Sequence, residues 1–172
     1  MIQLFETFLP NEIYKEFKTL GTSINWSNQK KLDSKYSTHF THTIPTELYK
    51  NKIPSPFNFI FNKLNYVDKV EYRPHSMYFN VYKHGDECGI HTDNITNGKN
   101  KTIIIYLTEV WKADWHGETL FYSKDDKKII GGSIPYPNNA VCFDSSLQHG
   151  VSPISRFCTE DRLIFVAQME AV

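Results

Sequence analysis

The 172-residue sequence contains few cysteines, no long apolar run and no excess of charge of either sign. Its three cysteines, Cys88, Cys142 and Cys158, are odd in number and lack CxxC spacing. This pattern argues against a disulfide framework and indicates a reduced, cytoplasmic protein. No segment approaches the roughly 18 consecutive apolar residues that cross a bilayer, and no signal segment precedes residues 11–20, so we expect no membrane role.

Charge is balanced, because Lys and Arg together number 19 and Asp and Glu together also number 19. A nucleic-acid-binding domain usually carries a basic excess, so the balance argues against a nucleic-acid partner. The length fits one domain with a substantial core, and we expect residues 1–172 to form a single domain. The sequence does not indicate an oligomeric state.

Residues 1–75 favour helices and loops. A short strand is expected at residues 2–8, followed by a helix over residues 11–20 that Gly21 ends. Residues 21–45 are polar and indicate a long loop or short irregular strands, which would build the substrate side together with the rest of this region. Two helical pieces are expected between residues 46 and 66, separated by Pro54 and Pro56.

From residue 76 onward the pattern changes to short strands. They are expected at residues 76–83, 89–92, 101–107, 118–122, 128–130, 140–144 and 163–169. Turns are expected at Asn97-Gly98, at Gly131-Gly132 and at residues 124–127 and 135–139. Helices followed by many strands predict an α+β, mostly β fold with a sandwich or barrel core over residues 76–169.

The candidate chemistry lies at His91-Thr92-Asp93, with His149 and Arg162 further along the chain. Residues two apart in a strand share a face, so His91 and Asp93 can project together. A distant His149 would complete a clamp of two imidazoles and one carboxylate, the ligand set of non-haem Fe(II) oxygenases, which leaves positions open for a chelating co-substrate and O2. The guanidinium of Arg162 could bind a second carboxylate of that co-substrate.

The HxD pattern alone is common, so the hypothesis depends on its surroundings. The surrounding landmarks follow one another in a fixed order: Tyr82, Gly85-Asp86, His91-Thr92-Asp93, the strand 103–107, Trp111, Gly117-Glu118-Thr119-Leu120-Phe121, the strand 140–144, His149 and Arg162. In this order the sequence resembles the 2-oxoglutarate and Fe(II)-dependent dioxygenases, most closely their prolyl 4-hydroxylase-like branch. The landmarks cover about half of the chain, from Asn80 to Gln168.

The resemblance implies a double-stranded β-helix (jelly-roll or cupin-like) core with the N-terminal helices packed on its major sheet. It implies His91, Asp93 and His149 as catalytic iron ligands and Arg162 as the partner of the distal carboxylate of 2-oxoglutarate. Tyr82 and Tyr106 match co-substrate positions, and Asn80 is grouped with them. The implied activity is hydroxylation of an unactivated C–H bond with release of succinate and CO2, on a prolyl or other residue of a protein or peptide.

Two departures from the family pattern stand out. His116 occupies the place of the first glycine of a Gly-Gly-Glu motif, and it could line the pocket mouth or only cap a strand. The spacing from His149 to Arg162 is longer than usual, which leaves Arg156 as a rival for the carboxylate. Arg162 is favoured because it opens the last expected strand, whereas Arg156 lies in a loop-like stretch.

Several alternatives remain open at this point. The substrate could be a free amino acid or a small natural product. The chain could be a non-catalytic 2-oxoglutarate-binding module, an oxidative nucleic-acid demethylase or a cupin-type metal hydrolase. Cys88 could join a zinc site, although three residues before His91 it should face away. Other histidines are expected to be exposed without a role, namely His39, His42 and His75, and residues 94–100 could be a flap beside the metal.

Overall fold

The computed structural model describes residues 1–29, 31–34, 37–93, 100–125 and 127–172. The α-helices are α1 (Asn11–Ser23) and α2 (Phe57–Asp68), with short 3-10 turns at Trp26–Asn28, Thr46–Leu48 and Ala113–Trp115. The strands are β1 (Ile2–Phe5), β2 (Lys31–Ser34), β3 (Ser37–Thr43), β4 (Tyr72–Tyr82), β5 (Cys88–His91), β6 (Lys101–Tyr106), β7 (Thr119–Tyr122), β8 (Ile129–Ser133), β9 (Ala140–Asp144), β10 (His149–Val151) and β11 (Arg162–Ala171).

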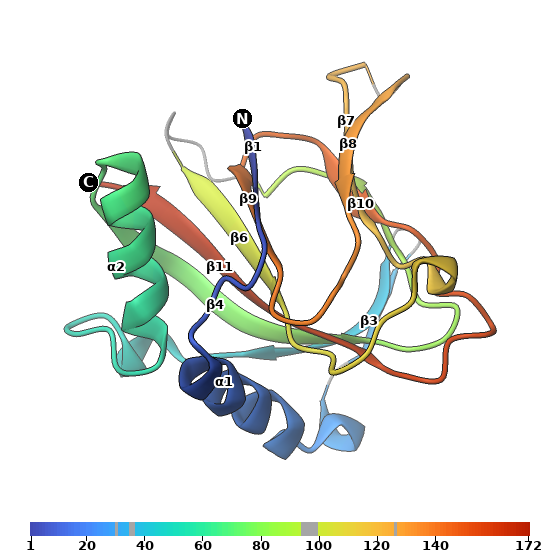
Figure 1. Cartoon of the computed structure of the whole chain (residues 1–172), viewed down its shortest axis with the longest axis horizontal. Coiled ribbons are helices and arrows are strands. Elements are labelled where there is room, and N and C mark those ends of the chain that lie inside the picture. The colour runs from blue at the N-terminus through green and yellow to red at the C-terminus, as the bar shows by residue number, and fades with distance from the viewer. Residues whose placement is uncertain (30, 35–36, 94–99, 126) are drawn as a thin grey trace.

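The strands form an antiparallel sheet that curls into two facing layers (Figure 1). The larger layer has the order β1-β9-β6-β11-β4-β3, and β2 pairs with β3. The smaller layer has the order β5-β10-β7-β8 and joins the larger one where Ser37 of β3 pairs with Cys88 of β5. This is the predicted double-stranded β-helix, and the fold is mostly β as expected.

The long strands of the larger layer divide their residues between two cores, because side chains alternate across a sheet. Odd-numbered residues of β11, such as Phe165, lie in the core that faces the helices. Even-numbered ones, such as Ile164 and Val166, lie in the inner core between the two layers. The register of β11 therefore decides which side chains reach the interior, and Arg162 is on the inward-facing set.

Both helices pack on the outer face of the larger layer, as predicted (Figure 1). The ring of Phe165 in β11 lies 4.9 Å from Phe17 of α1 and 5.4 Å from Phe57 of α2. Gly21 was expected to end the first helix, and this is wrong, since α1 continues to Ser23. A Cβ at Gly21 would come within 2.9 Å of Leu163, so the glycine allows close approach of helix and sheet.

Other expectations about local structure need correction. Residues 21–45 were expected to form a long loop or short irregular strands, and they contain β2 and the regular seven-residue strand β3, one face of which lines the pocket. Residues 46–53 contain a 3-10 turn in place of the first helical piece. The pair Gly131-Gly132 lies within β8 and makes no turn. The expected Asn97-Gly98 turn falls outside the described residues.

An ionic cluster joins the N-terminal region to the sheet. The carboxylate of Asp68, at the end of α2, accepts hydrogen bonds from Gln3 (2.9 Å), Lys101 (2.7 Å) and the hydroxyl of Tyr72 (3.0 Å). Burial alone would raise the pKa of Asp68, but these hydrogen bonds outweigh it and hold the pKa below its usual value. The charged form of Asp68 is therefore part of the folded structure.

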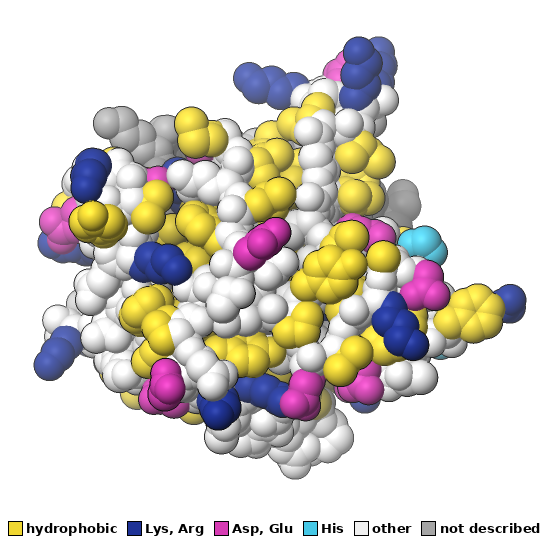
Figure 2. Space-filling view, in the orientation of Figure 1, with side chains coloured by type: hydrophobic (Ala, Val, Ile, Leu, Met, Phe, Trp, Pro, Cys, Tyr) yellow, Lys and Arg dark blue, Asp and Glu magenta, His cyan; other side chains and the backbone are white. Residues whose placement is uncertain are grey.

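The surface matches the balanced composition. Figure 2 shows acidic and basic side chains interspersed over one face of the molecule. Within the described residues, no helix is both long enough and apolar enough to cross a membrane.

Candidate active site

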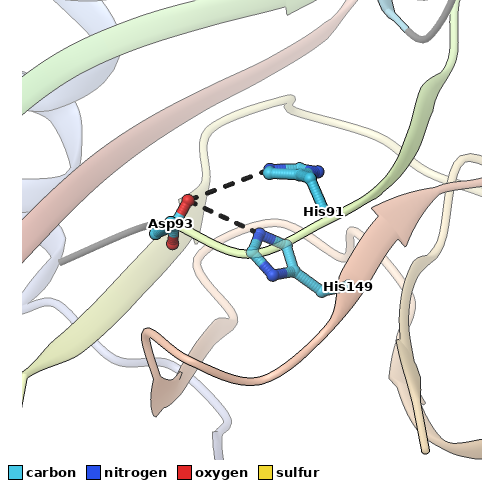
Figure 3. Close-up of side chains that lie close together, drawn as sticks. All are labelled: His91, Asp93 and His149. Carbon is cyan, nitrogen blue, oxygen red and sulfur yellow. Dashed lines mark ion pairs between the residues drawn. The ribbon is translucent and has the colours of Figure 1, made fainter. Parts of the chain in front are cut away.

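Three side chains predicted as metal ligands meet between the two layers (Figure 3). His91 ends β5, Asp93 follows two residues later, and His149 begins β10, which pairs with β5 so that His149 lies opposite His91. One potential ligand atom from each residue lies within 4.8 Å of the others. Oδ1 of Asp93 is 3.8 Å from Nε2 of both imidazoles.

The backbone fixes the orientation of both imidazoles. Nδ1 of His91 donates to the carbonyl of Gly89 at 2.9 Å, and Nδ1 of His149 donates to the carbonyl of Leu147 at 2.9 Å. A ring that donates from Nδ1 carries its lone pair on Nε2 when it is neutral. Both Nε2 atoms therefore face Asp93 as possible metal ligands.

The carboxylate of Asp93 is held from the neighbouring strand. The hydroxyl of Thr102, in β6, donates a short hydrogen bond to Oδ2 of Asp93 and lies 3.1 Å from the hydroxyl of Ser145. This contact leaves Oδ1 of Asp93 directed at the two histidines. Thr102 is thus an orienting residue that the sequence did not single out.

The electrostatic environment of the histidines is uneven. Burial lowers the pKa of His149. Burial would also lower the pKa of His91, but hydrogen bonds with Cys88 and Gly89 outweigh it and raise this pKa to about 9. A metal ion would compete with a proton at His91, as metal ligation by imidazole generally requires.

The three residues open onto a pocket of about 590 Å³. Its walls come from alternate residues of β3, β4, β6 and β11, from β5 and the two residues that follow it, and from β10: Ser37, His39, Thr41, Thr43, Ser76, Tyr78, Asn80, Tyr82, Cys88, Gly89, His91, Thr92, Asp93, Thr102, Ile104, His149, Val151, Ile164, Val166 and Gln168. A volume of this size suits a small-molecule site. The donor set of two imidazoles and one carboxylate, with open space beside it, fits a catalytic Fe(II) ion.

Arg162 is fully buried at the start of β11. Its guanidinium faces the rings of Tyr82 at 4.9 Å and Tyr106 at 5.3 Å, and Nη2 donates to the hydroxyl of Thr119 at 2.9 Å. Nε and Nη1 are buried without a hydrogen-bond partner. Among the described residues no carboxylate forms an ion pair with this guanidinium, so its buried charge lacks the counter-charge that buried ions normally have.

Only some of the predicted co-substrate residues line the pocket. Tyr82 and Asn80 line the pocket, whereas Tyr106 and Arg162 are buried next to Tyr82 and are not among the lining residues. Burial raises the pKa of Tyr82 well above its usual value, so its hydroxyl stays protonated. The hydroxyl of Tyr106 donates to Thr119 at 3.0 Å. Tyr82 therefore both lines the pocket and lies against the guanidinium of Arg162.

The rival arginine occupies a different environment. Arg156 is exposed in the loop before β11, where its guanidinium lies 5.0 Å from the ring of Phe157. It does not line the pocket. The choice of Arg162 over Arg156 for the co-substrate carboxylate stays a prediction.

Sequence reasoning missed His39. It was expected to be exposed, and this is wrong: it is 5% exposed, and its ring stacks on Tyr82 at 4.4 Å. Nδ1 of His39 lies 2.7 Å from the hydroxyl of Ser37. Burial and the charge of Arg162 lower the pKa of His39 to about 4, so the ring is neutral. Residues 37–43 are polar apart from Phe40, so no alternation of polar and apolar residues marked this strand in the sequence.

Two more pocket residues share a face with residues already singled out. Tyr78 precedes Asn80 and Tyr82 at two-residue spacing in β4, and Gln168 follows Arg162 at an even spacing in β11. Period-two alternation therefore could have placed both of them on the inner face.

Cys88 was expected to face away from His91, and this is wrong. Its Sγ lies 3.6 Å from Nδ1 of His91, although the spacing predicted opposite faces. The ring of His91 folds back toward its own strand to reach Gly89, and this brings it to the thiol. Cys88 contacts the ring nitrogen that points away from Asp93, so it does not join the three-residue cluster.

His116, which stands in place of the first glycine of the Gly-Gly-Glu motif, has an unusual backbone conformation. His116 has φ 57° and ψ −142°, a conformation that favours glycine. Its side chain is 60% exposed, and its backbone carbonyl accepts a hydrogen bond from the buried indole of Trp111 at 3.0 Å. It is absent from the pocket walls. The expected flap at residues 94–100 falls, except for Asn100, outside the described residues.

The sequence of the chain was compared with models of known protein families and with curated proteins. Residues 77–167, more than half of the chain, match the family model of the 2OG-Fe(II) oxygenase superfamily. No curated protein is significantly similar to the chain in sequence.

Solved structures resemble the whole chain. A prolyl-4-hydroxylase from Pseudomonas putida superposes with a TM-score of 0.70 at 15% identity, covering 98% of this chain and 91% of the other. A prolyl hydroxylase from Trichoplax adhaerens, solved with a hypoxia inducible factor peptide fragment, gives 0.70 at 16% identity, covering 98% and 82%. SnoN, a non-heme alpha ketoglutarate dependent epimerase from nogalamycin biosynthesis, gives 0.73 at 12% identity, covering 98% and 77%. At these identities the likeness shows a shared fold.

Proposed function

Because the chain belongs to the 2OG-Fe(II) oxygenase superfamily, we propose that it is an Fe(II)- and 2-oxoglutarate-dependent dioxygenase that hydroxylates an unactivated C–H bond. Its leading substrate is a prolyl or other residue of a protein or peptide. We further infer that residues 1–172 act as one domain, since the helices that precede residue 75 pack on the strands that follow it.

The buried guanidinium of Arg162 carries this proposal. A cluster of two histidines and one aspartate would also suit a cupin-type hydrolase, which has no use for a buried cation behind the pocket. Arg162 has two unpaired nitrogen donors in the interior, and a planar guanidinium pairs well with a carboxylate. A diacid that chelates a metal at one end and reaches Arg162 at the other would satisfy both features.

The residues take separate roles in this scheme. His91, Asp93 and His149 would hold Fe(II), and Thr102 would keep the Asp93 carboxylate turned toward the two imidazoles. When bound, iron, 2-oxoglutarate and O2 together supply oxidative decarboxylation to succinate and CO2, coupled to hydroxylation of the substrate. The protein contributes position, by placing the C–H bond close to the metal and by excluding water.

The same roles extend to the co-substrate side. Arg162 would bind the distal carboxylate, and Tyr82, which lines the pocket beside the guanidinium, would lie against the carbon chain of the co-substrate. Tyr106 would hold Thr119 in place as the hydrogen-bond partner of Arg162. Asn80 lines the cavity beside them.

Two observations bear on the substrate. The likeness to prolyl hydroxylases, one of them solved with a peptide fragment, supports a peptide substrate. The likeness to SnoN, an epimerase of a biosynthetic pathway, supports a small natural product as a second candidate. The balanced charge and the interspersed surface charges of Figure 2 argue against an oxidative nucleic-acid demethylase.

The test is an anaerobic titration of the protein with Fe(II) and 2-oxoglutarate, followed by exposure to air. We expect a weak visible charge-transfer band that requires both additions, and succinate formation after O2 is admitted. His149→Ala should remove both signals, because it deletes one of three ligands. His75→Ala is the matched control, since His75 is exposed and pairs with Glu170 away from the pocket.

The outcomes separate the alternatives. A band without succinate under any substrate would favour a non-catalytic 2-oxoglutarate-binding module. Absence of both band and succinate in the unmodified protein would refute the proposal.

A further inference from the structure

Several buried polar atoms of the protein have no hydrogen-bond partner. Six such side-chain atoms occur in the described part of the chain, and four of them belong to three residues: Oγ1 of Thr41, Oδ1 of Asn80, and Nε and Nη1 of Arg162. The other two, in Asn100 and Gln148, lie outside β3, β4 and β11. Buried polar atoms are nearly always paired in a native protein, so four unpaired atoms on three adjacent strands indicate a ligand.

The strand register places Thr41 and Asn80 side by side. Thr41 of β3 lies opposite Asn80 of β4, and Asn80 lies opposite Ile164 of β11. All three residues line the pocket, so they share the inner face of the sheet. Tyr106 of β6 extends the same row, because it pairs with Ile164.

The guanidinium of Arg162 lies close to this row. Arg162 is two residues before Ile164 on the same face of β11, a separation of about 7 Å along the strand. Its guanidinium lies 5.3 Å from the ring of Tyr106, which belongs to the row, and 4.9 Å from the ring of Tyr82. The four unpaired atoms are therefore gathered at the end of the pocket next to Arg162, where the co-substrate is proposed to bind.

The chemistry of the unpaired atoms suits a carboxylate. The nitrogens of Arg162 can only donate, and the hydroxyl of Thr41 can donate through its rotatable hydrogen. The amide of Asn80 can turn either its oxygen or its NH2 group to the same place, so it can donate as well. A carboxylate has about four lone-pair sites, and the two free nitrogens of Arg162 would occupy two of them. Donors from Thr41 and Asn80 would occupy the others.

We propose that Thr41 is a co-substrate-binding residue, whose hydroxyl donates a hydrogen bond to the distal carboxylate of 2-oxoglutarate beside Arg162. Thr41 precedes the stretch that matches the family model, so the role belongs to a part of the chain that the model does not describe. The inference rests on the proposed function, because it takes 2-oxoglutarate as the molecule that binds at this end of the pocket.

Folding of the free protein does not use the Thr41 hydroxyl. Its Oγ1 is buried and unpaired, so Thr41→Val removes a desolvated polar group without breaking a hydrogen bond. Valine has nearly the same shape and suits a strand equally well. In urea unfolding of the free protein, Thr41→Val should therefore be as stable as the unmodified protein or more stable.

The binding test is anaerobic calorimetry of the Fe(II)-loaded protein with 2-oxoglutarate. Thr41→Val should bind at least about tenfold more weakly, because it loses one hydrogen bond to a charged group. Thr41→Ser keeps the hydroxyl and should retain the affinity. Thr43→Val is the matched control, since it makes the same substitution in an exposed residue two positions along β3, further from Arg162, and it should leave the affinity unchanged.

A second keto acid tests which end of the co-substrate Thr41 contacts. 2-Oxovalerate has the same five-carbon chain but carries a methyl group in place of the distal carboxylate. Thr41→Val should not weaken its binding, because the hydroxyl then has no partner to lose. Comparison of the two keto acids on the two proteins thus isolates the contact between the hydroxyl and the distal carboxylate.

Three results would overturn the inference. These are an unchanged affinity of Thr41→Val for 2-oxoglutarate, an equal loss of affinity for 2-oxovalerate, and a clearly lower stability of Thr41→Val without ligand. Failure of the proposed function is distinguishable from these results. If the unmodified protein did not bind 2-oxoglutarate, the proposed function would fail and this inference with it, whereas binding that ignores Thr41→Val would overturn this inference alone.

Discussion

Replacement of Arg162 by Met should separate stability from co-substrate binding. In the free protein the guanidinium is fully buried, and its contacts are one hydroxyl and two aromatic rings. Removal of a buried charge that lacks a counter-ion is often neutral or stabilising. Thr119 keeps a hydrogen bond from Tyr106 after the change, so no new unpaired hydroxyl arises. We therefore expect Arg162→Met to melt at or above the temperature of the unmodified protein.

Binding of 2-oxoglutarate should respond in the opposite way. The two unpaired donors, Nε and Nη1, would each form a charge-assisted hydrogen bond worth about 1.5–3 kcal/mol, so their loss should cost roughly 3–6 kcal/mol. At 1.4 kcal/mol per factor of ten, this corresponds to roughly 10²–10⁴-fold weaker binding.

The assay is a thermal melt under anaerobic conditions with Fe(II), with and without 2-oxoglutarate. A ligand at 100 times its Kd stabilises by about 2.7 kcal/mol, and a domain of this size gains about 2–4 °C per kcal/mol, so a rise of about 5–10 °C is expected. Arg162→Met should lose this rise, and Arg156→Met, which changes an exposed arginine, should keep it. Retention of the full rise in Arg162→Met, or its loss in Arg156→Met, would refute the reasoning.

Three further predictions concern the scaffold. Gly150→Ala should destabilise the protein by about 1–3 kcal/mol in urea unfolding, because the new Cβ would lie 2.8 Å from the carbonyl oxygen of Cys88; unchanged stability would contradict this close approach. His116→Gly should raise stability by about 1 kcal/mol, since φ 57° strains any residue with a Cβ, and His116→Ala should not. Asp68→Asn should lower the melting temperature at pH 7. The folded pKa of Asp68 lies below its unfolded value near 4, so the charged carboxylate stabilises the protein above that pH. The difference between the two proteins should shrink as the pH falls below about 4, and a constant difference from pH 7 to pH 3 would show that Asp68 acts without its charge.

The three candidate metal ligands could be predicted because residue types and spacings in the sequence indicate them. His91 and Asp93 are two residues apart, and a strand places such residues on one face; in the structure β5 ends at His91, yet Asp93 still lies beside it. Their approach to His149 depends on the pairing of β5 with β10, which spacing does not contain. The ordered landmarks of a known family supplied that missing information, and they supplied the double-stranded β-helix as well.

The pocket wall formed by β3 could not be predicted so easily. The sequence of residues 21–45 left a long loop and short irregular strands equally open, because its polar residues are poor indicators of a regular strand, and His39 was accordingly expected to be exposed. Their polarity reflects a strand that faces a cavity in place of a core. The end of α1 was misplaced for a related reason, since Gly21 looks like a stop signal until its contact with Leu163 is known.

Strand β3 has a consequence for how such a protein can diversify. It lies outside residues 77–167, the stretch that matches the family model, yet it lines the same pocket as the metal cluster. The chemistry and one wall of the binding site are therefore encoded in separable stretches of the gene. Changes at His39, Thr41 and Thr43 can alter what fits beside the metal while the codons for His91, Asp93 and His149 stay as they are.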